Sequence, residues 1–291
     1  MMESLRFDRR PELRKPALIC SFRGWNDAAE SASSALRFLA TQWEAEDFGA
    51  IEPEEFFDFQ VTRPQVTLTE GLTRKIEWPE VELSSARPQG SDRDVVFVLG
   101  AEPNLRWRTF SETIVHVARE LGVEFVISLG ALLADVPHTR DVQITGIAAD
   151  ADLAEQLGFS QTRYEGPTGI VGVVHDACAR AGIVSASLWA PVPHYVASVP
   201  SPKASLALIH QVERLLDLSV DLSGLEEAAT EYERRLDEAV ASEPEVRALV
   251  ERLEQQMDES EIQFGDLPSG DSIAREFQRF LRDQPPPAEP E

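Results

Sequence analysis

The sequence predicts an α/β fold, a three-layer α/β/α sandwich built around a mostly parallel sheet. Two observations predict this class. Short apolar runs, rich in β-branched and aromatic residues, alternate with helical apolar periodicity along residues 1–220, which is typical of strands buried on both faces and of crossover helices. The links between each helix and the next strand are short, so we expect parallel crossover units with helices on both faces of one sheet.

The central strand is predicted at Phe125–Leu129, where an apolar run directly follows a helical pattern. Similar runs at Ala17–Phe22, Asp94–Gly100 and Ile183–Trp189 predict three further strands. Because the carboxyl ends of parallel strands meet at one edge of a sheet, the loops that follow these strands should lie close together. Weaker strand candidates are Phe56–Val61, Val142–Gly146 and an edge hairpin within Thr62–Asp94.

Helices are predicted between these strands. Asp27 followed by Glu30 is a capping-box pattern ahead of the apolar positions in Ala32–Trp43. Gly122 and Gly182 stand where two helices should end, since glycine readily takes the left-handed conformation just past a helix. The other predicted helices have their apolar positions in Phe110–Leu121, Ile170–Ala181 and Leu206–Leu216, and a short one is capped by Asp152 and ends at Gly158.

The last quarter of the chain is acidic and purely helical in pattern. From Asp221 to Glu291 there are 20 acidic and seven basic residues, which supply more than half of the net charge of -24. Apolar spacing predicts one helix over Leu225–Leu236 and another over Val246–Met257, the second preceded by a capping box at Ser242–Glu245. A third short helix carries Ile273, Phe277 and Phe280. We therefore expect a core domain at 1–220, an acidic helical extension at 221–284 and a disordered tail at 285–291.

The composition argues against several classes of protein. The net charge of -24 disfavours nucleic-acid binding, because phosphate contacts require clustered Lys and Arg. No apolar run is long enough to span a bilayer, and the charged stretch Met1–Lys15 does not resemble a signal peptide, so we expect a cytoplasmic protein that does not engage membranes. Cys20 and Cys178 are expected to be small buried side chains. Neither a zinc spacing nor a nucleotide-binding glycine pattern is found, so we expect no metal and no cofactor.

Reactive side chains follow several of the predicted strands. Carboxylates, histidines and an arginine converging there could bind a phosphate or carboxylate and supply acid–base chemistry. The same side chains could equally bond backbone amides and fix proline-containing loops. Gly166–Gly169, ahead of a helix, could hold an anion or could be a tight turn with Thr168 as the cap. The candidate ligand-binding residues are Trp25, Asn26, Asp27, Glu102, Asp135, His138, Thr139, Arg140, Thr168 and His194. No catalytic residue is assigned, because no nucleophile is paired in sequence with a base.

Five ordered motifs resemble those of a known family. They are Gly24–Ala28, Gly100–Pro103, Gly130–Thr139, Glu165–Gly169 and Ser187–Tyr195, and together they resemble the proteasome assembly chaperone 2 family in its actinobacterial branch. The resemblance covers about Arg14–Leu216. It implies an α/β/α fold similar to purine nucleoside phosphorylases, a homo-oligomer for which a trimer is suggested, and help in assembling proteasome α rings.

One departure from the family concerns the end of the chain. Relatives that dock on the proteasome use a C-terminal hydrophobic-Tyr-any tail, whereas this chain ends Ala288-Glu289-Pro290-Glu291, so docking by that route is not expected. Three hypotheses stay open. The leading one is a non-enzymatic, homo-oligomeric, chaperone-like protein with proteasome α subunits as candidate partners. The second is a binding protein or enzyme for a nucleoside- or phosphate-like anion, and the third is an acidic helical scaffold acting through its C-terminal helices.

Overall fold

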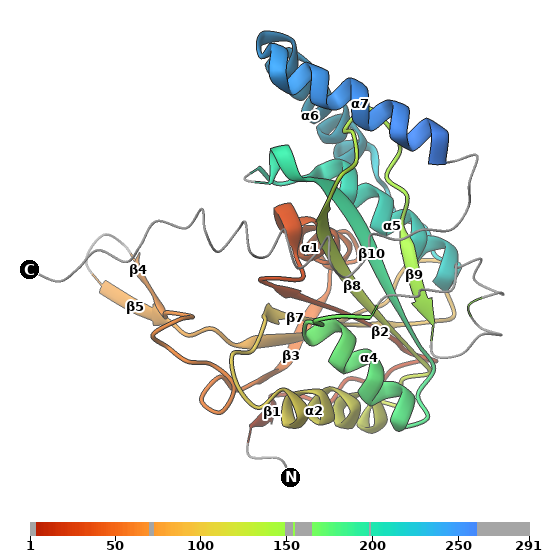
Figure 1. The fold of residues 1–291 in the computed structure, drawn as a ribbon. Coiled ribbons are helices and arrows are strands. Elements are labelled where there is room, and N and C mark those ends of the chain that lie inside the picture. Colours follow the sequence, from red (N-terminus) through yellow and green to blue (C-terminus); the bar gives the residue numbers. More distant parts are fainter. Residues whose placement is uncertain (1–3, 70–72, 149–153, 155–164, 198, 261–291) are drawn as a thin grey trace, which may run out of the picture.

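An eight-stranded sheet forms the centre of the protein (Figure 1). The computed structural model describes residues 4–69, 73–148, 154, 165–197 and 199–260. The strand order is β1-β3-β6-β7-β2-β8-β10-β9, with helices on both faces, which confirms the predicted α/β/α class. The strands are β1 (Leu5–Phe7), β2 (Ala17–Arg23), β3 (Glu46–Ile51), β6 (Val81–Ala86), β7 (Val95–Ala101), β8 (Phe125–Ala134), β9 (Thr145–Ala148) and β10 (Ser185–Pro193).

The four central strands β7, β2, β8 and β10 run parallel, and each face of the sheet carries its own apolar core. Leu18, Cys20 and Phe22 pack with α2 (Trp107–Glu120) and α4 (Ile170–Arg180). Ala17 and Ile19 pack with α1 (Ser31–Gln42) and α5 (Pro202–Leu216) on the opposite face. Successive residues of a strand point to opposite faces, so one apolar strand serves both cores.

The two cysteines behave as small buried side chains, as predicted. Cys20 in β2 and Cys178 in α4 are free and buried in the same core. Burial raises the pKa of the Cys178 thiol to about 11 and also raises that of Cys20. Both thiols are therefore protonated and unreactive at neutral pH.

The edge of the sheet that includes β1 and β3 differs from the prediction. Phe56–Val61 is not a strand; the segment forms turns, and Phe56 packs edge-on against Phe110 of α2. Its aromatic side chains are buried by packing on a helix instead of by strand pairing. The strand in this region is β3. It begins with the charged residues Glu46 and Asp47, so the apolar run that follows them is too short to indicate a strand.

A second sheet of two strands stands apart from the main one (Figure 1). It is the hairpin of β4 (Gln65–Thr69) and β5 (Thr73–Glu77), within the segment where an edge hairpin was predicted. Val66 pairs with Ile76, and both lie with Leu68 on one face of the hairpin. All three side chains are more than half exposed, so this apolar face is open to solvent.

The central strands extend further than their sequences indicate. β8 continues to Ala134, and β10 continues to Pro193, because the two strands pair in register over their whole length. Proline is tolerated at the end of β10 because the antiparallel strand β9 pairs with β10 only as far as Trp189. Gly130–Ala134, beyond the predicted strand Phe125–Leu129, and Pro191–Pro193, predicted as part of the loop after Ile183–Trp189, therefore belong to strands.

The acidic extension begins with two helices, α6 (Ser223–Ser242) and α7 (Pro244–Ser260), as the apolar spacing predicts. α6 packs on α5 and on α7, and the two helices lie beyond the carboxyl ends of β8 and β10 (Figure 1). The predicted Ser242–Glu245 capping box is wrong: Ser242 ends α6, and its hydroxyl donates to the carbonyl of Ala239. The division into domains stays a prediction. The helix ending at Gly158, the third C-terminal helix and the tail lie outside the described residues.

Candidate functional site

The candidate residues lie on loops at the carboxyl edge of the parallel strands. The chain continues from β2 to β3 on one side of the sheet and from β8 to β9 and β10 on the other side, so the connections diverge between β2 and β8. Ligands of open α/β sheets usually bind at such a point. Here the backbone of the chain occupies it, because the Ala131 amide donates to the Asn26 carbonyl over 2.7 Å.

A first group of candidates joins three segments. Asn26, which follows β2, is completely buried and donates from Nδ2 to Oε1 of Glu102 over 2.6 Å. The same oxygen accepts the backbone amide of Ile170, the first residue of α4, at 2.9 Å. A carboxylate at this position satisfies a free helix amide and complements the positive end of the helix dipole. Glu102 thus caps α4 from a distant loop, and we refer to these contacts as the Glu102 clamp.

Close packing surrounds the Glu102 clamp. A Cβ added to Gly169 would lie 2.0 Å from Oδ1 of Asn26, so only glycine fits under this side chain. Gly24 has φ of +140°, which L-residues avoid, and lies directly beside Glu102. Asn26 Oδ1 is buried without a hydrogen-bond partner in the described part of the chain.

Asp27 also acts as a cap. Its Oδ1 accepts the amides of Ala32 at 2.8 Å and Ser33 at 3.1 Å, at the start of α1. The predicted capping box with Glu30 is wrong, because Ala29 and Glu30 take left-handed conformations (φ of 51°) and α1 begins only at Ser31. Burial raises the pKa of Asp27, while the bonds from Ser33 and Ala32 oppose that shift.

Thr168 and Trp25 lie beside the Glu102 clamp without joining it. Gly169, not Thr168, is the residue at the cap position of α4, because Glu102 supplies the capping oxygen. Thr168 is exposed at its surface. The Trp25 side chain is 44% exposed. These two side chains are therefore available to solvent at the carboxyl edge.

A second group of candidates centres on His138, in the loop after β8. The ring is almost completely buried, with Nδ1 2.8 Å from the Tyr195 hydroxyl oxygen and Nε2 3.2 Å from Oδ1 of Asp237 on α6. The His138 backbone amide donates to the same tyrosine oxygen at 2.8 Å. A carboxylate can only accept, so this arrangement places the proton on Nε2 and leaves Nδ1 to accept from Tyr195.

Thr139 and Arg140 bind the second acidic helix. Arg140 donates from Nε to Oδ1 of Asp258 at 3.0 Å and from Nη2 to Oδ2 at 2.9 Å. Its Nη1 lies 3.3 Å from Oε1 of Glu254, which also accepts the Thr139 hydroxyl. The arginine holds the pKa of Asp258 below its usual value through these hydrogen bonds. Both candidates are therefore engaged by carboxylates of the same chain.

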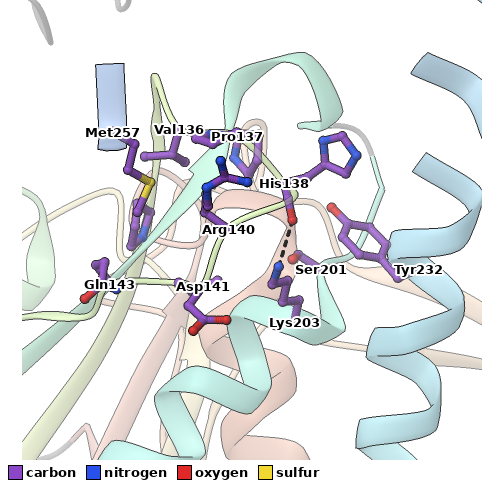
Figure 2. A pocket seen from close by; sticks show the side chains of 13 residues that line it. Val136, Pro137, His138, Arg140, Asp141, Gln143, Ser201, Lys203, Tyr232 and Met257 are labelled. Atoms are coloured by element: carbon purple, nitrogen blue, oxygen red, sulfur yellow. Dashed lines mark hydrogen bonds between the residues drawn. The ribbon is translucent and has the colours of Figure 1, made fainter. Parts of the chain in front are cut away.

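Lys203, at the start of α5, completes this group (Figure 2). Its Nζ donates to the His138 carbonyl over 2.7 Å and pairs with Glu233 of α6. A cavity of about 30 Å³ lies next to it, with room for one or two water molecules. The residues that line it include His138, Arg140, Lys203, Ser201, Tyr232 and Met257, the last two supplied by α6 and α7.

Asp135 and His194 lie close together without meeting the geometry of a hydrogen bond. The His194 Nδ1 atom lies 3.1 Å from Oδ1 of Asp135. Tyr195 connects this pair to His138, because its ring packs edge-on against both imidazoles. Asp135, His138 and His194 are thus brought together, as the shared edge of the sheet predicts.

The ten candidates therefore form two groups with different partners. Trp25, Asn26, Asp27, Glu102 and Thr168 surround the starts of α1 and α4. His138, Thr139 and Arg140 contact α6 and α7, and Asp135 and His194 lie beside them through Tyr195. Sequence reasoning missed the residues that hold the second group together: Tyr195, Lys203, Glu233, Asp237, Glu254 and Asp258. Two signals were present in the sequence. The carboxylates recur four residues apart on each helix, and Lys203 is one of only three lysines.

Two features of the described residues limit the class of site. Within the described ranges, no three His, Cys, Asp or Glu side chains come together as metal ligands. Every helix in those ranges is too short or too polar to cross a lipid bilayer.

Comparison with known proteins identifies relatives. The model of the PAC2 family matches residues 21–240. A PAC2 family protein of Streptomyces avermitilis shares 47% identity, with 81% of this chain and 99% of that chain covered and a TM-score of 0.77. Rv2125 of Mycobacterium tuberculosis, described as a proteasome-assembly chaperone homologue, shares 46% identity, with 80% and 99% covered and a TM-score of 0.75. No curated protein matches the chain.

More distant structures share the fold. PbaB of Pyrococcus furiosus, described as an archaeal proteasome activator, is 17% identical, with 81% of this chain and 97% of that chain covered and a TM-score of 0.67. At this identity the likeness concerns the fold alone. The fold is therefore common to bacterial and archaeal proteins that differ widely in sequence.

Proposed function

This chain belongs to the PAC2 family, and on that premise we propose that it is a chaperone-like, homo-oligomeric protein that assists proteasome assembly without catalysing a reaction. The observation that carries the proposal is the 46% identity, over most of the chain, to a protein described as a proteasome-assembly chaperone homologue. Proteasome α subunits are the proposed partners. The proposed location is the cytoplasm.

The state of the candidate residues supports a binding role over catalysis. Glu102 and Arg140 are engaged by contacts within the chain, in the Glu102 clamp and the Arg140–Asp258 pair. Catalytic groups instead need free access to a substrate and a pocket that holds it. The cavity at His138 holds at most two water molecules, which is too little for a metabolite.

Self-association is supported by the β4–β5 hairpin. Val66, Leu68 and Ile76 form an open apolar face, and an isolated two-stranded hairpin is marginally stable in water unless that face is packed. The hairpin also carries Arg74 and Lys75 in a chain whose net charge is -24. These cations are balanced by Glu70 and Glu77 of the same segment, and Lys75 Nζ lies 3.7 Å from Glu77 Oε1, so the open apolar face is the feature that fits a second copy, which we propose as its occupant.

The first test is native purification of the tagged full-length chain from its own cells, with mass spectrometry of bound proteins and light scattering of the complex. We expect proteasome α subunits in the eluate and a mass of several copies of the chain. A second step mixes the purified chain with α subunits and follows ring formation over time. A single-chain mass without α subunits, or turnover of a metabolite by the pure protein, would contradict the proposal.

A second candidate function is binding of a small phosphate- or nucleoside-like anion, favoured by the approach of Arg140 and Lys203 to one cavity. The present cavity volume means that such a ligand would have to displace α6 and α7. A thermal-shift screen with phosphate and nucleosides tests it, because a ligand that binds only the folded state raises the melting temperature. The chain with Arg140→Gln and Lys203→Gln should show no such rise.

A further inference from the structure

The contact between the acidic helices and the core follows a regular pattern. Glu233 and Asp237 lie four residues apart on α6, and Glu254 and Asp258 lie four residues apart on α7. Residues with this spacing share one face of a helix. Each helix therefore presents a pair of carboxylates, one turn apart, to the core.

The core side of this contact is built to hold carboxylates. We call it the cationic edge, formed by His138, Thr139, Arg140 and Lys203. Arg140 takes both oxygens of Asp258 with two parallel N–H groups, the geometry that gives arginine its specificity for carboxylates. Lys203 is mostly buried and is aimed at Glu233 by its bond to the His138 carbonyl. The cationic edge is thus positioned by the core itself.

The helices that cover the cationic edge are held with few apolar contacts. Of the residues in α6 and α7, only Ala229, Tyr232, Val250 and Leu253 are buried hydrophobic side chains within the described range. The side chains of Asp237 and Asp258 remain 66% and 55% exposed in their ion pairs. Exposed ion pairs add little to stability and are weakened by salt. A contact of this kind can therefore be replaced by a similar contact from another protein segment.

From these observations we propose that the cationic edge is a docking site for an acidic helix of a partner protein, and that α6 and α7 are its built-in occupant. The partner is a helix that carries carboxylates four residues apart, the pattern with which α6 and α7 bind. The partner helix reaches the cationic edge when it displaces α6 and α7. The proposal is independent of the proteasome assignment, because it concerns the chemistry of the partner segment and holds for any protein that supplies it.

The test uses the full-length chain and a fluorescent peptide of residues 221–260 as the acidic partner. Fluorescence anisotropy measures peptide binding to the wild type and to a released variant with E233Q, D237N, E254Q and D258N. We expect the released variant to bind the peptide at least tenfold more tightly, since its own helices no longer neutralise the cationic edge. Binding should weaken as salt is added.

Matched variants test whether the peptide binds at the cationic edge. A chain with E227Q, E245Q, E251Q and E259Q loses the same charge from exposed positions of the same helices and should bind like the wild type. Adding R140Q and K203Q to the released variant should abolish the gain, as should neutralising the four carboxylates of the peptide. Circular dichroism checks folding, and E254Q with D258N is the milder release if the fourfold variant unfolds. Equal binding by released and wild-type chains, or a gain that survives R140Q and K203Q, would overturn the proposal.

Discussion

Asn26 donates a 2.6 Å hydrogen bond to Glu102, and this contact joins the loops that follow two adjacent strands, β2 and β7. Because Glu102 also accepts the Ile170 amide, the start of α4 is attached at the same place. Three of the five sequence motifs, Gly24–Ala28, Gly100–Pro103 and Glu165–Gly169, therefore meet in the Glu102 clamp. Their residues have a structural role in fixing the carboxyl edge of the sheet.

Removing the clamp carboxylate should destabilise the protein. In Glu102→Ala, Asn26 Nδ2 and the Ile170 amide lose their shared acceptor, and each unsatisfied donor costs about 1–3 kcal/mol. Glu102→Gln should cost less, because its amide oxygen can still accept both bonds. Urea unfolding measures the difference. Glu165→Ala, at an exposed position of the neighbouring loop, is the control and should change the unfolding free energy by less than about 0.5 kcal/mol.

A methyl group at Gly169 should be as damaging as loss of the carboxylate. The added Cβ would lie 2.0 Å from Asn26 Oδ1, so Gly169→Ala must push the amide away from Glu102. Overpacking of this kind costs about 1–3 kcal/mol. Gly224→Ala is the matched control: nothing lies within 4 Å of its added Cβ, and alanine favours the helix there. Equal melting temperatures for Gly169→Ala and the wild type would show that the loop has room to move.

The burial of Asp27 predicts a particular pH dependence. Its pKa is raised above the ordinary value of 3.8, so the folded state holds this proton more tightly than the unfolded state does. The free energy of unfolding therefore decreases as pH rises from below 3.8 through the raised pKa. The loss is about 1.4 kcal/mol for every tenfold difference in proton affinity between the folded and unfolded states. Asp27→Asn removes this dependence, and its stability relative to the wild type should increase between about pH 3 and pH 7.

A carboxylate of opposite behaviour provides the control for this measurement. The pKa of Asp258 is lowered by Arg140, so its ionised form favours folding, and that contribution is lost as pH falls through the lowered pKa. Asp258→Asn should therefore lose stability relative to the wild type as pH rises through the lowered pKa towards 3.8, below the range in which Asp27→Asn gains it. Denaturant titrations at several pH values measure both. If the unfolding free energies of both variants, relative to the wild type, changed in the same direction with pH, burial would not be the cause of the raised Asp27 pKa.

Most of the central fold could be predicted because its strands are apolar on both faces. The runs at Ala17–Phe22 and Phe125–Leu129 are buried by two helical layers, so sequence alone marks them. Strand ends were harder, since Gly130–Ala134 extends β8 only because β10 pairs alongside it. Phe56–Val61 has strand-like composition, yet Phe56 is buried against α2 without strand pairing. Tertiary packing, which no local pattern records, decides both cases.

The sequence predicted where the candidate residues lie, but it did not predict which residues they contact. Loops after parallel strands share an edge, so Asp135, His138 and His194 could be placed together from the strand pattern. That Asp237 and Asp258 would bind His138 and Arg140 depends on how α6 docks on α5, and the charge spacing of a helix does not reveal its binding surface. The N-cap was misplaced at Thr168 for a similar reason, because Glu102 comes from a distant loop.

The Tyr195 hydroxyl should matter for stability because it serves two groups of His138. Tyr195→Phe leaves the His138 amide and Nδ1 without their common partner, which should cost about 1–3 kcal/mol. Tyr232→Phe is the matched control, since the buried Tyr232 hydroxyl has at most a weak contact with Ser201, whereas the Tyr195 hydroxyl serves two groups of His138. Urea unfolding should separate the two variants clearly. Similar midpoints for both would mean that water replaces the tyrosine at His138.

The apolar face of the β4–β5 hairpin should determine the size of the assembly. Val66 and Ile76 face each other across the hairpin, so Val66→Thr with Ile76→Thr makes the centre of that face polar while keeping β-branched side chains suited to strands. Light scattering should then report a single chain in place of the oligomer that we propose for the wild type. Thr67→Ala with Lys75→Ala alters the paired residues on the opposite face and should leave the oligomer intact. If both variants keep the wild-type mass, self-association uses another surface, because a seam through this face cannot tolerate polar groups at its centre.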